Sequence, residues 1–388
     1  MDRTRSERSA GSASHLHSLT PLRGIAAFWV VLYHYIHQYL PSLDPEAHTQ
    51  ILDKGYLAVD LFFLLSGFVM THVYRDTFAP AAQGERPPGG YWQFITARVA
   101  RLYPMHLWML GLFMAVAVAV RILQYAATGR IETIPLDGAR SISALVANLF
   151  LLQGLHASAL SWNYPAWSIS TEFMAYLVFP FVLPWVSRAS RAVQFGLVVL
   201  AFAILAHLSD FGRDLNQWNG VGALLRCGSE FLLGILLYLA FRNGRVEALA
   251  SHDALVLAVL GALLLLLHTG ASDLVTVALF AALILSAVAN AGRIAGLLNV
   301  APLIWLGEVS YSLYLIHEFV QYVTSAVLEQ GFGITRSDRL PEAWSWALML
   351  AMVSVSLLLA DLGYRRIELV GRRRLRRALS ALGTGAAK

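Results

Sequence analysis

The chain has 388 residues, of which 57% are hydrophobic and only 14% charged, and its mean hydropathy is +0.59. Soluble domains carry roughly 25% charged residues, so this composition excludes a soluble enzyme and indicates an integral membrane protein. A single cysteine, Cys227, excludes an internal disulfide and any cysteine-based zinc or iron–sulfur site. The net charge of +5 comes mostly from arginine, which in a membrane chain relates to topology and lipid headgroups, and we expect no nucleic-acid partner.

Apolar stretches recur along most of the chain. Residues 1–17 are rich in Ser and Arg and are predicted to form a disordered basic tail rather than a signal peptide. Ten stretches follow, each near the roughly 20 residues that a helix needs to cross a bilayer. They cover residues 24–40, 56–74, 102–124, 166–186, 193–209, 221–241, 254–270, 274–290, 300–328 and 343–363. A further apolar segment, 142–155, is short enough to be a re-entrant or interfacial helix, or a short eleventh span.

The placement of arginine favours ten crossings over eleven. With a cytoplasmic N-terminus and ten crossings, the basic C-terminal segment also lies inside, and most Lys and Arg residues fall in cytoplasmic loops. We therefore predict an all-α, polytopic integral membrane protein of the inner (cytoplasmic) membrane, with about ten transmembrane helices and both termini cytoplasmic. One membrane domain would span residues 18–372, followed by a basic C-terminal tail at 373–388.

A few titratable residues interrupt the apolar stretches. An ionisable group at the centre of a bilayer helix costs about 2.5–3.5 kcal/mol on insertion scales, so each is a candidate functional residue. His34, Asp60 and Glu172 fall at similar depths, where an imidazole with a carboxylate partner could remove a proton from a hydroxyl. The alternative is that these residues hydrogen-bond neighbouring helices. Arg226 and Glu230, four residues apart on one helix face, are predicted to form a structural ion pair.

Two arginines mark the cytoplasmic end of the third apolar stretch. Arg98 and Arg101 lie three residues apart, so they share one helix face. Guanidinium groups bind phosphate oxygens through paired hydrogen bonds, so this pair could hold a nucleotide-like cofactor or a lipid phosphate. Plain positive-inside anchoring explains the same spacing equally well.

Five segments, taken in order, resemble the signatures of a known family. They are RGIAAFWVVLYH (23–34), VDLFFLLSGFVM (59–70), RVARLYP (98–104), WSISTEF (167–173) and SYSLYLIHEF (310–319). Together they are similar to the acyltransferase-3 family of integral membrane acyltransferases, over about residues 18–372. Each string is mostly apolar and unspecific alone, but the five occur in the expected order.

The resemblance implies transfer of an acyl group, commonly acetyl, from cytoplasmic acyl-CoA to a hydroxyl of a carbohydrate or glycolipid acceptor. It implies that His34, separated from Arg23 by ten residues, is catalytic, and that Arg98 and Arg101 handle acyl-CoA. The remaining matches are Phe63, Ser66, Gly67 and Phe68 of one motif and Glu172 of another. The family's Glu-x-Pro ending is altered here, because Glu368 is followed by Leu369 and Val370. We expect this difference to have no consequence for catalysis, since it is remote from His34.

These inferences combine into one expected mechanism. Acyl-CoA would bind with its phosphates near Arg98, Arg101 and Arg23. His34 would act as a general base or carry the acyl group, with Glu172 or Asp60 holding its tautomer. Ser66 is a less favoured acyl carrier, since its SGF context also suits close helix packing.

Other interpretations stay open at this point. Ser310, Tyr311 and His317 could line the acceptor side or serve packing. A polytopic transporter or flippase for a small or lipid-linked substrate is the alternative, because it too would use buried titratable groups and a basic cytoplasmic mouth. We expect no bound cofactor and no metal, with acyl-CoA acting as the donor substrate and the lipid bilayer as the surroundings. The sequence does not specify the acceptor or the oligomeric state.

Overall fold

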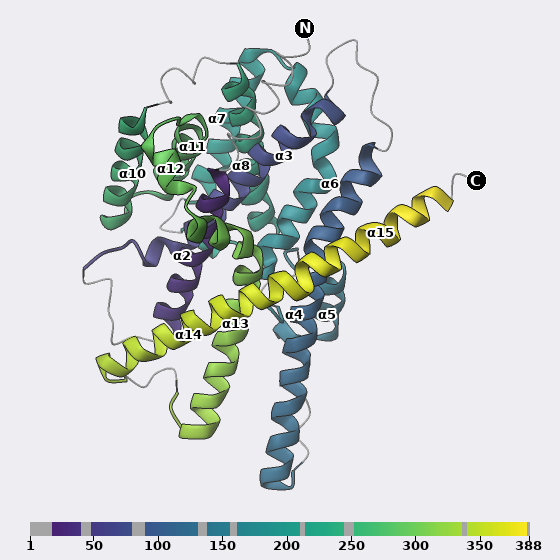
Figure 1. Ribbon diagram of the computed structural model, residues 1–388, viewed down its shortest axis with the longest axis vertical. Coiled ribbons are helices and arrows are strands. Elements are labelled where there is room, and N and C mark those ends of the chain that lie inside the picture. The colour runs from purple at the N-terminus through teal and green to yellow at the C-terminus, as the bar shows by residue number, and fades with distance from the viewer. Residues whose placement is uncertain are drawn as a thin grey trace.

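The computed structural model describes residues 18–39, 48–79, 90–130, 138–155, 161–209, 214–243, 252–335 and 340–385, and these contain helices and turns without strands (Figure 1). The helices run over Leu19–Tyr39 (α2), Ala58–Phe78 (α3), Gly90–Thr128 (α4), Ile142–Leu149 (α5), Ala166–Arg188 (α6), Arg191–Leu208 (α7), Val221–Arg242 (α8), Asp253–His268 (α10), Asp273–Ala289 (α11), Arg293–Leu298 (α12), Ala301–Phe332 (α13), Glu342–Gly363 (α14) and Leu369–Gly385 (α15). The predicted all-α class is confirmed, and the predicted tail at 1–17 lies outside the described residues.

Every one of the ten apolar stretches contains a helix. In hydrocarbon each backbone N–H and C=O must be bonded within the segment, which is why apolar stretches of this length fold as helices. Among the described residues, six helical segments are long and apolar enough to cross a membrane, which supports a multi-pass membrane protein. The number of about ten crossings and the cytoplasmic termini stay predictions.

The short segment after the third stretch is a single small helix. α5 has eight residues, or about 12 Å at 1.5 Å per residue, far less than the roughly 30 Å hydrocarbon core. Ser141 caps its first turn by accepting a hydrogen bond from the Ala144 N–H, 3.1 Å away. His106 of α4 bonds the Asn148 carbonyl at 2.9 Å, which ties α5 to the bundle. This segment is therefore too short to be an eleventh span.

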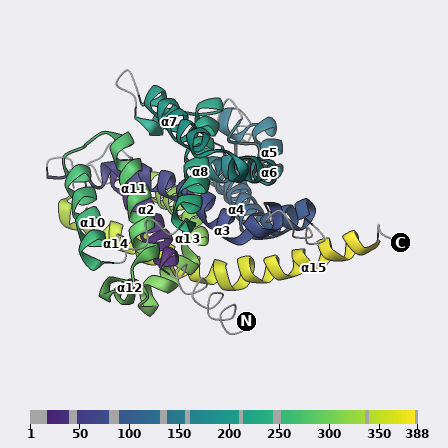
Figure 2. The same cartoon turned by 90° about the horizontal axis from the view of Figure 1, so that it is seen from above.

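Two close helix pairs organise the core. α2 packs along α13, and α3 packs along α8. At the first contact Gly24 faces the backbone of Gly307, and at the second Gly67 faces the backbone of Phe231 while Gly234 faces that of Leu64. Small residues let the two backbones approach without side chains between them. Figure 2 shows α10, α11 and α12 together on one side of the bundle and α5 and α6 on the other.

The last helices form one long element with an irregular turn. α14 passes through a π-helical turn, Tyr364–Glu368, into α15, whose far end extends beyond the bundle (Figures 1 and 2). A π turn inserts one extra residue into a helix and rotates the residues that follow it. The segment predicted as a separate tail from residue 373 thus continues a helix that begins at Leu369.

Candidate active site

A small cavity lies where α2, α3, α6 and α13 meet. Its volume is about 60 Å³. Six residues that the sequence analysis singled out line it: Arg23, Phe63, Ser66, Glu172, Ser310 and Tyr311. They come from four helices spread over nearly 290 positions of the chain, and the close α2–α13 contact helps to bring them together. Tyr314 and Ser168 also line the cavity, and sequence reasoning missed both.

Glu172 is the acceptor at the centre of a short hydrogen-bond network. Its Oε1 accepts hydrogen bonds from the Ser66 hydroxyl and, at 2.5 Å, from the Tyr176 hydroxyl one turn along α6. The Tyr176 ring in turn lies 5.7 Å from the guanidinium of Arg98. Glu172 therefore connects the serine of the SGF motif to the arginine pair.

His34 and His317 lie beside each other, next to Tyr314 of the cavity lining. Their ring centroids lie 4.9 Å apart, and the His317 ring lies 5.8 Å from that of Tyr314. Nδ1 of His34 lies 2.9 Å from the Val30 carbonyl oxygen. Because a carbonyl only accepts, this contact places a proton on Nδ1 and makes Nε2 the basic nitrogen. The role that we assigned to Glu172 or Asp60, holding the tautomer, is thus filled by a backbone carbonyl.

The arginine pair lies on one helix, as predicted from its spacing. Nη2 of Arg98 donates to the Tyr74 hydroxyl at 3.1 Å, and the Arg101 guanidinium lies 5.2 Å from the Tyr311 ring centroid. Tyr311 lines the cavity and donates to the Leu102 carbonyl at 2.7 Å. Arg101 therefore contacts the cavity lining through Tyr311, whereas Arg98 reaches the lining residue Glu172 through Tyr176. Both arginines precede Pro104 in α4.

Glu368 contacts Arg101, a pairing that the sequence analysis did not predict. It is fully buried, forms an ion pair with Arg101 through Oε1, and accepts a hydrogen bond from Ser312 at 2.8 Å through Oε2. The altered motif after it was interpreted as a remote tail difference without consequence. The available signal was a lone glutamate within a run of arginines, outside every apolar stretch.

Asp60 is bound by a different partner from the one expected. Its two carboxylate oxygens accept from Arg226, with Nε to Oδ1 at 2.8 Å, and both side chains are buried. Arg226 also donates to the Leu215 carbonyl at 3.0 Å. The predicted pair within α8 is therefore replaced: the ion pair of Arg226 reaches across to α3, and Glu230 lies buried beside it. This geometry favours the helix-bridging interpretation of Asp60.

The remaining motif residues divide between the cavity and helix packing. Gly67 faces the α8 backbone, and Phe68 stacks edge-on against Tyr238 with ring centroids 5.3 Å apart. Ser310 donates to the Gly307 carbonyl at 2.8 Å, which anchors it within α13 beside the close contact with α2. Over the described ranges, no group of three or more His, Cys, Asp or Glu side chains is placed to hold a metal ion.

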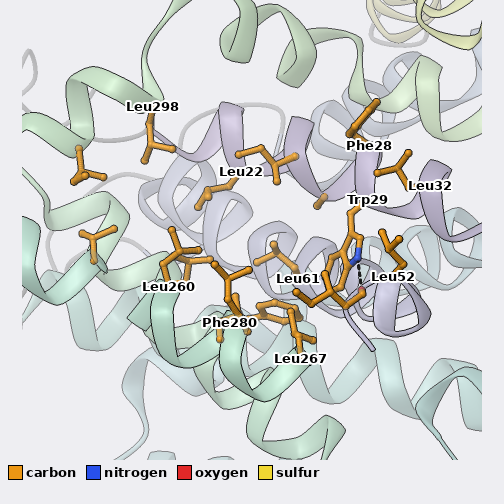
Figure 3. A pocket seen from close by; sticks show the side chains of 18 residues that line it. Leu22, Phe28, Trp29, Leu32, Leu52, Leu61, Leu260, Leu267, Phe280 and Leu298 are labelled. Carbon is orange, nitrogen blue, oxygen red and sulfur yellow. Dashed lines mark hydrogen bonds between the residues drawn. The ribbon is translucent and has the colours of Figure 1, made fainter. Parts of the chain in front are cut away.

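A larger apolar pocket, of about 390 Å³, lies between α2, α10, α11 and α12 (Figure 3). Leucines from α2, α3, α10, α11 and α12 line it together with Trp29 and Phe280, and Trp29 Nε1 donates to the Ile51 carbonyl at 2.7 Å. Its lining holds no titratable side chain. This pocket therefore offers no group for proton transfer, and the smaller cavity is the candidate active site.

Comparison with known proteins identifies the family. The model of the acyltransferase-3 family, described as an acyltransferase domain, matches residues 16–364. The chain is 30% identical to acyltransferase MdmB of Streptomyces mycarofaciens, covering 92% of this chain and 93% of that protein. It is 26% identical to the exopolysaccharide production protein ExoZ of Rhizobium meliloti, covering 86% of this chain and 95% of that protein.

A longer relative shows the same likeness over part of its length. The putative peptidoglycan O-acetyltransferase YrhL of Bacillus subtilis is 24% identical, covering 86% of this chain and 55% of that protein. No solved structure matches the chain. The family match covers most of the chain and includes His34, both arginines, Glu172 and the cavity residues. The protein therefore belongs to the acyltransferase-3 family.

Proposed function

We propose that the protein transfers an acyl group, with acetyl as the first candidate, from cytoplasmic acyl-CoA to a hydroxyl of a carbohydrate or glycolipid acceptor. The observation that carries this proposal is the cavity at the junction of α2, α3, α6 and α13. Arginines Arg98 and Arg101 are attached to one part of its lining, and the His34–His317 pair is attached through Tyr314 to another. A phosphate-binding group and a general base are the two elements that acyl transfer from CoA requires.

The cavity volume suits the reacting end of the donor. About 60 Å³ holds a few water molecules by the same measure, which fits a thioester carbonyl with a small acyl group rather than a whole cofactor. The CoA phosphates would bind Arg98, Arg101 and Arg23 at the cytoplasmic mouth, and the pantetheine arm would enter between the helices. This orientation follows the predicted topology, with both termini cytoplasmic and the protein in the inner membrane.

The chemical step uses His34 as a general base. Nε2 of His34 takes the proton from the acceptor hydroxyl while that oxygen attacks the thioester carbonyl carbon. A C–O bond forms and the C–S bond breaks, and the CoA thiolate then takes the proton back from the imidazolium. The Val30 carbonyl keeps the second proton on Nδ1 throughout, so the imidazole enters each cycle in the same tautomer. His317 packs on the ring and limits its rotation.

The acceptor class comes from the relatives. Their names mention peptidoglycan O-acetylation and exopolysaccharide production, and this supports a carbohydrate as the acceptor. The transporter alternative shares the buried titratable groups, but family membership supplies no support for it.

The test uses purified protein in lipid nanodiscs with radiolabelled acetyl-CoA. Wild type is compared with His34→Ala and with Arg98→Ala/Arg101→Ala, after each variant has been shown to fold by its melting temperature. We expect wild type to bind acetyl-CoA and to release CoA when polysaccharide acceptors are added. The arginine variant should lose binding, whereas the His34 variant should bind and release no CoA. Wild-type protein that binds no acyl-CoA would contradict the proposal.

A further inference from the structure

The segment from the π-helical turn into α15 brings two charged residues to the arginine pair. Glu368 ends the π turn and Arg372 follows it by four residues, so both project from one face of the helix. The contact with α4 is close, because Gly371 lies directly against the Pro104 ring. The start of α15 is therefore held beside the helix turn that carries Arg101.

Glu368 has a defined relationship to Arg101. Its side chain is fully buried, whereas that of Arg101 keeps 18% of its surface exposed. One carboxylate oxygen pairs with Arg101 and the other accepts from Ser312 of α13. A guanidinium has five N–H donors in a rigid plane, so this pair fixes the orientation of that plane without using all of its donors.

Arg372 belongs to the same charge cluster. Its side chain is half-buried, and its charge acts on the guanidinium groups of both Arg98 and Arg101, as does the charge of Arg23 on Arg101. Its neighbours Arg373 and Arg374 are exposed instead. The positive charges of Arg23, Arg98 and Arg372 thus all act on Arg101, and a bound polyanion offsets this repulsion.

We propose that the start of the C-terminal helix completes the donor site, with Arg372 binding a phosphate group of the donor and Glu368 acting as a positioning residue for Arg101. This inference rests on the proposed acyl-CoA donor. It assigns function to Glu368 and Arg372, which lie beyond the residues matched by the family model, 16–364, and to which the sequence analysis gave no role.

The test measures the affinity for CoA by displacement of radiolabelled acetyl-CoA from protein in nanodiscs. We expect Arg372→Ala to raise the Kd for CoA about tenfold, the effect of losing one charge-assisted hydrogen bond to phosphate. Arg374→Ala is the matched control, since it removes the same charge from an exposed position of the same helix. In turnover assays Arg372→Ala should raise KM and leave kcat unchanged.

Glu368→Gln tests the positioning role by the sign of its effect. Glu368→Gln removes a negative charge from the site, so the change in charge alone would tighten the binding of the anionic CoA. Loss of the fixed Arg101 orientation would instead weaken CoA binding, and we expect the Kd for CoA to rise about tenfold. If Glu368→Gln is too unstable to assay, Arg372→Ala decides the proposal.

Three results would contradict these roles, and they differ in what they leave standing. Wild type that binds CoA while Arg372→Ala binds as tightly as Arg374→Ala overturns this inference alone. A folded Glu368→Gln variant with unchanged or tighter binding overturns the positioning role. Wild type that binds no CoA overturns this inference together with the proposed function.

Discussion

The His34 ring on α2 faces the His317 ring on α13, with centroids 4.9 Å apart. The two helices lie in close contact along this stretch, and the Tyr35 hydroxyl donates to the His317 carbonyl at 3.1 Å. The His34 ring is held by the Val30 carbonyl through Nδ1, whereas the His317 ring is fully buried. We therefore assign different roles to the two histidines: His34 is the proposed general base, and His317 packs against its ring.

The unequal roles predict different kinetic effects. His34→Ala should reduce acyl transfer by about 10²–10⁴-fold, the usual contribution of a general base. His317→Phe keeps a ring against His34 but removes its nitrogens, so we expect a smaller loss in kcat with unchanged donor affinity. Single-turnover CoA release in nanodiscs measures both effects. The control is His268→Ala, an exposed histidine at the end of α10. Equal losses for His34→Ala and His268→Ala would refute the assignment.

The Asp60–Arg226 ion pair predicts a stability effect that depends on both partners. Both side chains are buried, so removing one leaves an uncompensated charge, at a cost of about 3–5 kcal/mol. Asp60→Asn and Arg226→Gln should therefore each lower the melting temperature sharply. Asp60→Leu/Arg226→Met should regain part of the loss, because neither charge remains.

Activity of that double variant separates structure from catalysis at Asp60. If Asp60 only bridges α3 and α8, the folded double variant should still release CoA from acetyl-CoA in the presence of acceptor. A double variant with a normal melting temperature and no turnover would instead return Asp60 to the catalytic set.

Ser66 and Glu172 share a hydrogen bond but should differ in importance. Glu172 accepts from Ser66 and Tyr176, and Tyr176 supports Arg98, so Glu172→Gln disturbs the network on both sides. We expect Glu172→Gln to reduce turnover more than Ser66→Ala does. Intact-protein mass spectrometry after incubation with acetyl-CoA should show no acetyl group on Ser66. A stable acetyl-serine there would make Ser66 an acyl carrier and reverse this order.

The helices of this protein were predictable from the sequence because their cause is local. A run of about 20 apolar residues in hydrocarbon must satisfy its own backbone, so each stretch became a helix whichever neighbours it acquired. The same local logic correctly placed Arg98 and Arg101 on one helix face. Glu172 was identified as a titratable residue within an apolar stretch, whereas Arg23 and Ser66 were identified through the family resemblance.

The pairings between distant helices were not predictable in this way. Arg226 has a carboxylate four residues away at Glu230, yet its ion pair goes to Asp60, 166 positions earlier in the chain. Spacing along one helix cannot show that another helix presents a better-placed partner. Glu368 was missed for a related reason, since a π-helical turn, which no apolar period reveals, precedes α15 and helps to set the face on which it lies.

The α3–α8 contact predicts which glycines tolerate a methyl group. A Cβ on Gly67 would meet the Phe231 carbonyl, and one on Gly234 would meet the Leu64 carbonyl, so both backbones would have to separate. Overpacking of this kind typically costs about 1–3 kcal/mol. Gly228 lies on the same helix as Gly234 but has open space where its Cβ would be. Gly228→Ala should therefore keep or raise the melting temperature in detergent, because alanine is a better helix former than glycine, while Gly67→Ala and Gly234→Ala should lower it.

Because Ser66 precedes Gly67 and lines the cavity, the two destabilised variants should also lose CoA release at temperatures where they remain folded. If Gly234→Ala had the same melting temperature as Gly228→Ala, α3 and α8 would not be in backbone contact.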